Sequence, residues 1–180
     1  MKHLFLLRHA KSAWDDFDLP DHERPLSRRG QRGARLIAEA MAADGSLPDR
    51  ILCSPAERCR QTLAILLDRI GTAPVVVFVD AIYQPASPDY RNVIGGRGGD
   101  AERLMVIGHN PTIQATAISL AGSGEDDLVE KMAAKYPAGA LAVLAFDIAD
   151  WWALAPHTGR LTTYLVPRAL VAAAEAGRNT

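Results

Sequence analysis

An arginine and a histidine stand side by side at the end of an apolar run near the start of the chain. The run covers residues 4–7, and Arg8 and His9 follow it directly. Such a run predicts a buried strand, and in open α/β sheets ligands bind at the carboxyl ends of the strands. Arginine can grip a phosphate group with two parallel hydrogen bonds, and histidine can attack phosphorus as a nucleophile. The pair therefore indicates phosphate chemistry at this strand end.

Two further strand ends carry residues of the same kind. A strand over 51–53 leads into Ser54 and a helix whose first turn holds Arg58, and a strand over 104–107 is followed by His109. If these strands are parallel neighbours of the first, their carboxyl ends meet at one edge of the sheet, where helix N-termini add partial positive charge and free N–H groups. Each residue alone also fits a solvated turn or a helix surface. The conjunction of two arginines and two histidines at three strand ends favours a phosphate site.

The alternation of short apolar runs with helical patterns predicts a mostly parallel sheet of about six strands in a three-layer α/β/α sandwich. Strands are expected at residues 3–7, 51–53, 75–79, 104–107, 141–146 and 161–166. Helices are expected at residues 28–43, 54–70, 112–121 and 169–176. Ser27 is a suitable N-cap for the first helix.

Two segments in the middle of the chain need an interpretation of their own. The unbroken β-branched and aromatic run at 75–79 predicts a strand that is buried on both faces. The glycine-rich segment at 95–99 predicts a flexible surface connection. It is not a phosphate loop, because it precedes a strand and no Gly-Lys-Ser/Thr follows it.

Composition narrows the class of protein. The chain has 180 residues, of which 48% are hydrophobic and 23% charged, which predicts one domain over residues 1–180. The formal net charge of −1 and the lack of a basic tail argue against nucleic acid or a membrane surface as a partner. No apolar run approaches the roughly 20 residues that span a bilayer, and the N-terminus lacks a secretory cleavage pattern. We therefore expect the protein in the cytoplasm.

The two cysteines, Cys53 and Cys59, are expected to be buried, reduced thiols. A cysteine-dependent phosphatase loop needs an arginine six positions after its cysteine. Those positions hold Cys59 and Ile65, so that class of phosphatase is excluded.

Three motifs together resemble those of the histidine phosphatase superfamily. The superfamily pattern is Arg-His-Gly near the N-terminus, then Ser-Pro-x-x-Arg-x-x-x-Thr, then a late histidine after a strand. The corresponding segments here are Arg8-His9-Ala10, residues 54–62, and Val106-Ile107-Gly108-His109. Other features resemble the SixA-type phosphohistidine phosphatases: Arg24-Pro25-Leu26 before Arg29-Gly30, Gly108-His109-Asn110-Pro111, and Lys135-Tyr136-Pro137-Ala138-Gly139-Ala140. The likeness runs from about residue 2 to about residue 170, and alanine in place of the motif glycine removes no reactive group.

The resemblance implies a role for each candidate residue. It implies that His9 is the nucleophile and becomes a phosphohistidine, which water then hydrolyses. Arg8 and Arg58 are expected to hold the nonbridging oxygens, and His109 to add a hydrogen bond or a charge. Ser12 is expected among the substrate-binding residues. We expect no cofactor and no metal, because phosphoryl transfer needs mainly positioning and charge neutralisation, which two arginines and one imidazolium can supply.

The acid that would protonate a leaving alcohol is absent from the positions where superfamily relatives carry it. Asn110 follows the late histidine, and no glutamate follows the strand at 75–79. The loop after His9 holds titratable residues that are close enough in sequence to reach the site, although a solvated loop is the interpretation we favour for each. These residues are Asp15, Asp16, Asp18, Asp21 and His22. Without an acid, phosphate esters are poor substrates, whereas a protonated phosphohistidine leaves as neutral imidazole.

The sequence therefore predicts a phosphatase that acts on phosphohistidine in a phosphorylated protein, and a histidine-phosphotransfer domain is one form that this partner can take. Two alternatives stay open. One is a phosphomonoesterase that acts on a small metabolite or a phosphopeptide. The other is a noncatalytic phosphate-binding module, and the intact His9 argues against it, since binding alone needs no nucleophile.

Overall fold

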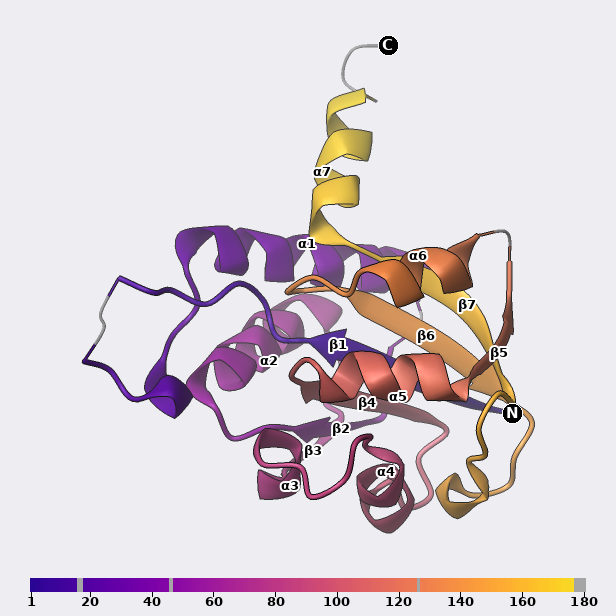
Figure 1. The fold of residues 1–180 in the computed structure, drawn as a ribbon. Helices are drawn as coiled ribbons and strands as arrows, with labels where there is room; N and C mark the ends of the chain where they lie inside the picture. The colour runs from indigo at the N-terminus through magenta and orange to yellow at the C-terminus, as the bar shows by residue number, and fades with distance from the viewer. Residues whose placement is uncertain (16–17, 46, 126, 177–180) are drawn as a thin grey trace.

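The structure is a computed structural model that describes residues 1–15, 18–45, 47–125 and 127–176 (Figure 1). Its centre is a seven-stranded sheet in the order β3-β2-β4-β1-β6-β7-β5. The strands are β1 (Lys2–Arg8), β2 (Arg50–Cys53), β3 (Val75–Phe78), β4 (Arg103–Gly108), β5 (Ala121–Gly124), β6 (Leu141–Phe146) and β7 (Gly159–Leu165). The helices are α1 (Arg28–Asp44), α2 (Glu57–Ile70), α3 (Asp80–Tyr83), α4 (Arg91–Arg97), α5 (Thr112–Leu120), α6 (Leu128–Ala134) and α7 (Pro167–Ala176). Two short 3-10 turns are η1 (Asp21–Glu23) and η2 (Trp151–Ala153).

The strands that end in candidate residues are parallel neighbours. β4 pairs in parallel with β1 on one side and with β2 on the other, and β2 also pairs in parallel with β3. β6 runs antiparallel to β1 and β7, so the sheet is mostly parallel, as predicted. It has one strand more than expected, because the helix predicted over 112–121 ends at Leu120 and residues 121–124 form β5 beside β7.

Alternate residues of β1 face two different helical layers. Leu4 and Leu6 belong to a core shared with α4, α5 and α6, whereas Phe5 and Leu7 belong to a core shared with α1 and α2. This is the pattern expected of a strand that is covered on both faces. Figure 1 shows α1 and α5 on opposite faces of the sheet. The predicted three-layer α/β/α sandwich is confirmed.

The first long helix begins and ends where the sequence predicts. The Ser27 side chain accepts a hydrogen bond from the Gly30 backbone N–H at 3.1 Å, so it caps α1. The helix ends at Gly45, whose φ of 71° suits glycine. No helix among the described residues is both long and apolar enough to cross a membrane.

The strand at Val75–Phe78 is not buried on both faces, and that prediction was wrong. β3 lies at the edge of the sheet, where β2 is its neighbour. Val75 and Phe78 are 54% and 47% exposed. Their residue types favour a strand, but only the order of strands decides whether that strand is central or at an edge.

The glycine-rich segment at 95–99 is also different from the prediction. Gly95 and Gly96 lie within α4 and pack against Trp152, and a Cβ atom on Gly95 would come within 2.5 Å of Trp152 Cε3. These glycines therefore allow a helix to approach an indole ring closely, and they are not part of a flexible connection.

Candidate active site

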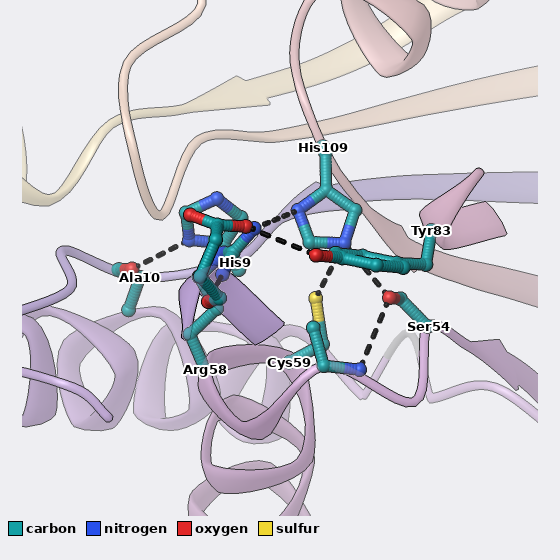
Figure 2. A network of polar contacts seen from close by, with 9 residues as sticks. His9, Ala10, Ser54, Arg58, Cys59, Tyr83 and His109 are labelled. Carbon is teal, nitrogen blue, oxygen red and sulfur yellow. Dashed lines mark hydrogen bonds and ion pairs between the residues drawn. The ribbon is translucent and has the colours of Figure 1, made fainter. Parts of the chain in front are cut away.

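The three strand ends bring their candidate residues together at one edge of the sheet. Arg8 pairs with Gly108 in the register of β1 and β4, and the His9 backbone N–H donates to the Gly108 carbonyl at 3.1 Å. The centroids of the His9 and His109 rings are 5.0 Å apart. Arg58 Nη2 lies 3.3 Å from His109 Nδ1. The convergence expected from the sequence is present, and Figure 2 shows these side chains around one point.

His9 is held in a form that suits a nucleophile. Its Nδ1 lies 2.8 Å from the Ala10 carbonyl oxygen. Because a carbonyl can only accept, Nδ1 carries the proton and Nε2 keeps its lone pair. Burial, together with the charges of Arg58 and Arg8, lowers the pKa of His9 to about 4, against the opposing effect of the Ala10 carbonyl. The ring is therefore neutral at neutral pH.

The segment that follows His9 is fixed to α2 by the threonine of the second motif. The Ala10 backbone N–H donates to Thr62 Oγ1 at 3.1 Å, and the Thr62 hydroxyl donates to the Arg58 carbonyl at 2.7 Å. Thr62 and Ala10 are both buried. This threonine thus connects the segment that follows His9 to the helix that carries Arg58.

His109 has the opposite tautomer. The Arg58 guanidinium can only donate, so His109 Nδ1 accepts and its Nε2 carries the proton. Nε2 donates to Ser54 Oγ at 2.8 Å and lies 3.5 Å from Cys59 Sγ (Figure 2). Burial, then the proximity of His9 and Arg58, lower the pKa of His109 to about 3. The ring at this position is therefore a neutral imidazole at neutral pH and not the imidazolium that was expected, and its contacts are hydrogen bonds.

Ser54 and Cys59 are contacts of His109 that the sequence analysis did not single out. Ser54 is fully buried, and its Oγ also accepts from the Ala56 backbone N–H at 3.3 Å. Its place in the Ser-Pro motif was the available signal. Cys53 and Cys59 are buried and free, as predicted. Burial raises the pKa of the Cys59 thiol to about 12.

Arg8 is held by the segment that precedes β6. Its Nη1 donates to the Tyr136 carbonyl at 2.8 Å, and the Gly139 backbone N–H donates to the His9 carbonyl at 3.0 Å. Arg8 Nε is buried and has no partner among the described residues. Burial and the charge of Arg58 lower the pKa of Arg8. Two cations close together, one with an unused donor, form a site that an anion would stabilise.

Arg58 is 8% exposed and already contacts a carboxylate. Its Nη1 donates to the Asp21 backbone carbonyl at 2.6 Å, and its Nη2 donates to Asp21 Oδ2 at 3.0 Å. The Tyr83 hydroxyl donates to the same Oδ2 at 3.2 Å. Burial opposes ionisation of Asp21, but the hydrogen bonds and charge of Arg58, with Tyr83, lower its pKa overall.

Asp21 is exposed, as a residue of a solvated loop would be, but it also reaches the site through Arg58. Asp15 and Asp18 are exposed as expected, while His22 contacts Glu23. Asp16 lies outside the described residues. No sequence signal distinguishes Asp21 from the other aspartates, because its contact with Arg58 depends on how η1 packs against α2.

Ser12 is buried and forms a β-bridge with Leu26. Within the described part of the chain, its hydroxyl makes no hydrogen bond to the histidines or arginines of the site. Its role in substrate binding stays a prediction. Among the same residues, no group of three or more His, Cys, Asp or Glu side chains is placed to hold a metal ion.

Comparison with known proteins identifies the family. The model of the histidine phosphatase superfamily (branch 1) matches residues 4–80. An uncharacterized protein of Mycobacterium tuberculosis is 38% identical over 165 residues, which are 90% of this chain and 100% of that protein. The chain belongs to the histidine phosphatase superfamily.

The solved structures point to one group within it. A protein from Agrobacterium tumefaciens that is assigned as the phosphohistidine phosphatase SixA is 34% identical, with a TM-score of 0.76 over 92% of this chain and 97% of that one. The protein histidine phosphatase SixA complexed with tungstate shares the fold, with a TM-score of 0.69 at 20% identity over 93% of this chain and 99% of that one. The protein is a SixA-type member of the superfamily, and this membership supports a phosphatase activity.

Proposed function

We propose that this protein hydrolyses phosphohistidine on a protein substrate through a covalent phosphohistidine at His9. The observation that carries the proposal is the fixed tautomer of His9. Its Nδ1 proton is held by the Ala10 carbonyl, which leaves the Nε2 lone pair free. The positive charges of Arg8 and Arg58 lie close enough to lower its pKa.

In the first step the Nε2 lone pair of His9 forms a bond to phosphorus as the bond to the leaving group breaks. The electron pair of the broken bond goes to the leaving nitrogen. Arg8 and Arg58 hold the nonbridging oxygens, and the His109 ring, fixed by Ser54, lies beside them. Charge neutralisation by donors that are already in position is the main requirement of phosphoryl transfer.

In the second step water forms a bond to phosphorus and the bond to His9 Nε2 breaks. The electron pair returns to Nε2, and the water proton passes to the phosphate product or to solvent. Nδ1 keeps its proton and donates it in a hydrogen bond to the Ala10 carbonyl. The phosphorylated ring is therefore an imidazolium, and it departs as neutral histidine. The contact that makes His9 a nucleophile thus also makes it a good leaving group.

The same reasoning favours a phosphohistidine substrate over an ester. A leaving alcohol must gain a proton as it departs. The residue that follows the late histidine is Asn110, which is not an acid. The carboxyl group that does reach the site, Asp21, has a lowered pKa and is ionised at neutral pH. We propose a protein partner, such as a histidine-phosphotransfer domain, in the cytoplasm, and catalysis without a metal ion.

The test is to trap the intermediate. After rapid mixing with substrate labelled in its phosphoryl group, an alkaline denaturing quench should leave an acid-labile label on His9. His9→Ala should lose both the label and turnover, by at least about a thousandfold, as expected when a nucleophile is removed. His157→Asn is a matched control, because asparagine tolerates the positive φ of 58° at that position. Full turnover by His9→Ala, or label on another residue, would refute the proposal.

A further inference from the structure

The mouth of the site has its own polar pair, which we call the rim: Asp21 and Tyr83. The Asp21 side chain is 57% exposed, while the Arg58 side chain that it contacts is 9% exposed. The Tyr83 ring stands edge-on to the His109 ring, with centroids 5.6 Å apart (Figure 2). The rim therefore lies between solvent and the phosphate-holding groups.

The geometry of the reaction places the leaving group against this rim. His9 is 8% exposed and lies beneath the site, so a phosphoryl group must enter from the solvent side. In-line displacement puts the leaving atom opposite the attacking His9 Nε2. That direction is toward solvent, where the carboxylate of Asp21 is held by Arg58 and by the Tyr83 hydroxyl.

Asp21 occupies donors of Arg58 that a phosphate would use. Its Oδ2 accepts a hydrogen bond from Arg58 Nη2 at 3.0 Å. An incoming phosphate competes with the Asp21 carboxylate for that nitrogen. A carboxylate next to a bound phosphate is unfavourable unless a positive group lies between them or near them.

We propose that Asp21 determines specificity by pairing with a leaving group that carries a positive charge, namely the protonated ring of a phosphohistidine. This inference rests on the proposed function and adds the reason for its selectivity. A phosphohistidine protonated on its second nitrogen brings an imidazolium to the rim, where the carboxylate stabilises it. A phosphate ester brings no positive charge, and its phosphate meets only repulsion from Asp21.

The step balances without any further reactant. The bond from His9 Nε2 to phosphorus forms as the bond from phosphorus to the substrate nitrogen breaks. The electron pair goes to that nitrogen and cancels the positive charge of the ring, which leaves as neutral imidazole. Asp21 neither gives nor takes a proton, so it acts as a fixed charge.

The experiment compares two substrates at pH 7, a short peptide that carries phosphohistidine and p-nitrophenyl phosphate. The variant is Asp21→Asn, which keeps an oxygen for Arg58 and Tyr83 and removes the charge. We expect kcat/KM for the peptide to fall about tenfold, a moderate factor because the side chain is half-exposed. We expect kcat/KM for the aryl phosphate to stay within about twofold or to rise.

Glu23→Gln is the matched control, because it removes the same charge from the same turn and the Glu23 side chain contacts His22. It should leave both substrates unchanged. An equal loss on both substrates in Asp21→Asn, or a larger loss on the ester, would overturn the inference. A wild-type enzyme that hydrolyses the ester but not the peptide would refute the proposed function itself, before any variant is compared.

Discussion

The floor and the rim of the site are built in different ways. The floor, which we define as Arg8, His9, Ser54, Arg58 and His109, is set at strand ends and at the start of α2. Backbone groups such as the Ala10 and Tyr136 carbonyls hold it. The rim, Asp21 and Tyr83, comes from a short 3-10 turn and a short helix. Backbone contacts fix the tautomer of His9 on the floor, whereas side chains and solvent surround the rim.

The difference teaches where chemistry and selectivity reside. Groups that attack phosphorus must be preorganised to within a fraction of an ångström, which a central parallel sheet provides. Groups that contact the leaving group must stay accessible to a substrate as large as a protein. We therefore expect changes to the floor to affect all substrates and changes to the rim to affect them unequally.

After the loss of His9 itself, the largest effect should come from the two arginines. Arg8→Ala and Arg58→Ala should each reduce kcat/KM by at least about 30-fold, equivalent to about 2 kcal/mol of transition-state stabilisation. Because we propose that both bind the phosphoryl group itself, the loss should be similar for phosphohistidine and ester substrates. Steady-state kinetics on both substrates measures this, with Arg60→Ala as control, since Arg60 lies on the same helix and stacks on Phe78. A loss confined to one substrate would break the distinction between floor and rim.

A smaller effect should follow from Ser54→Ala. Ser54 positions the ring of His109 by accepting from its Nε2, and leaving that buried N–H unpaired should lower kcat/KM about five- to tenfold on both substrates. Nitrogen NMR of the histidine rings should show a loss of the fixed His109 tautomer.

Ser27→Ala is the control variant for Ser54→Ala. It removes the cap of α1 and should reduce the free energy of unfolding by about 1 kcal/mol without changing kcat/KM. An unchanged His109 spectrum in Ser54→Ala would show that Cys59 and Arg58 suffice to hold the ring.

The smallest effect is expected on the protonation of the two histidine rings when the pH changes between about 5 and 8. The pKa values of His9 and His109 are lowered to about 4 and about 3, so neither ring should titrate in this range by NMR. In the unfolded chain both rings should titrate near about 6.5.

This difference in pKa between the folded and unfolded states also makes the free energy of unfolding depend on pH. Since the unfolded state binds more protons, the free energy of unfolding should fall as the pH is lowered from about 6.5 toward about 4. A midpoint near 6 for either ring in the folded protein would mean that the floor is more solvated than its burial indicates.

Much of the fold could be predicted because local patterns report local structure. The cap at Ser27 and the strand that ends at Arg8 were read from neighbouring residues alone. Burial of β3 and the packing of Gly95 were not, because each depends on a partner distant in sequence. Val75 has the residue type of a buried strand, but β3 pairs with another strand on one side only, and Val75 is exposed. Gly95 has the residue type of a loop, but Trp152 needs the space that a side chain would fill.

The sequence by itself determined which residues are the candidates for the chemistry. Arg8, His9, Arg58 and His109 follow from their types and from their positions at strand ends, because apolar runs and helix starts are visible in a single chain. The tertiary structure decided that β2, β4 and β1 are neighbours, which protonation state each ring holds, and that Asp21 reaches Arg58. Those properties depend on burial and on contacts between distant segments, and such contacts exist only once the chain has packed.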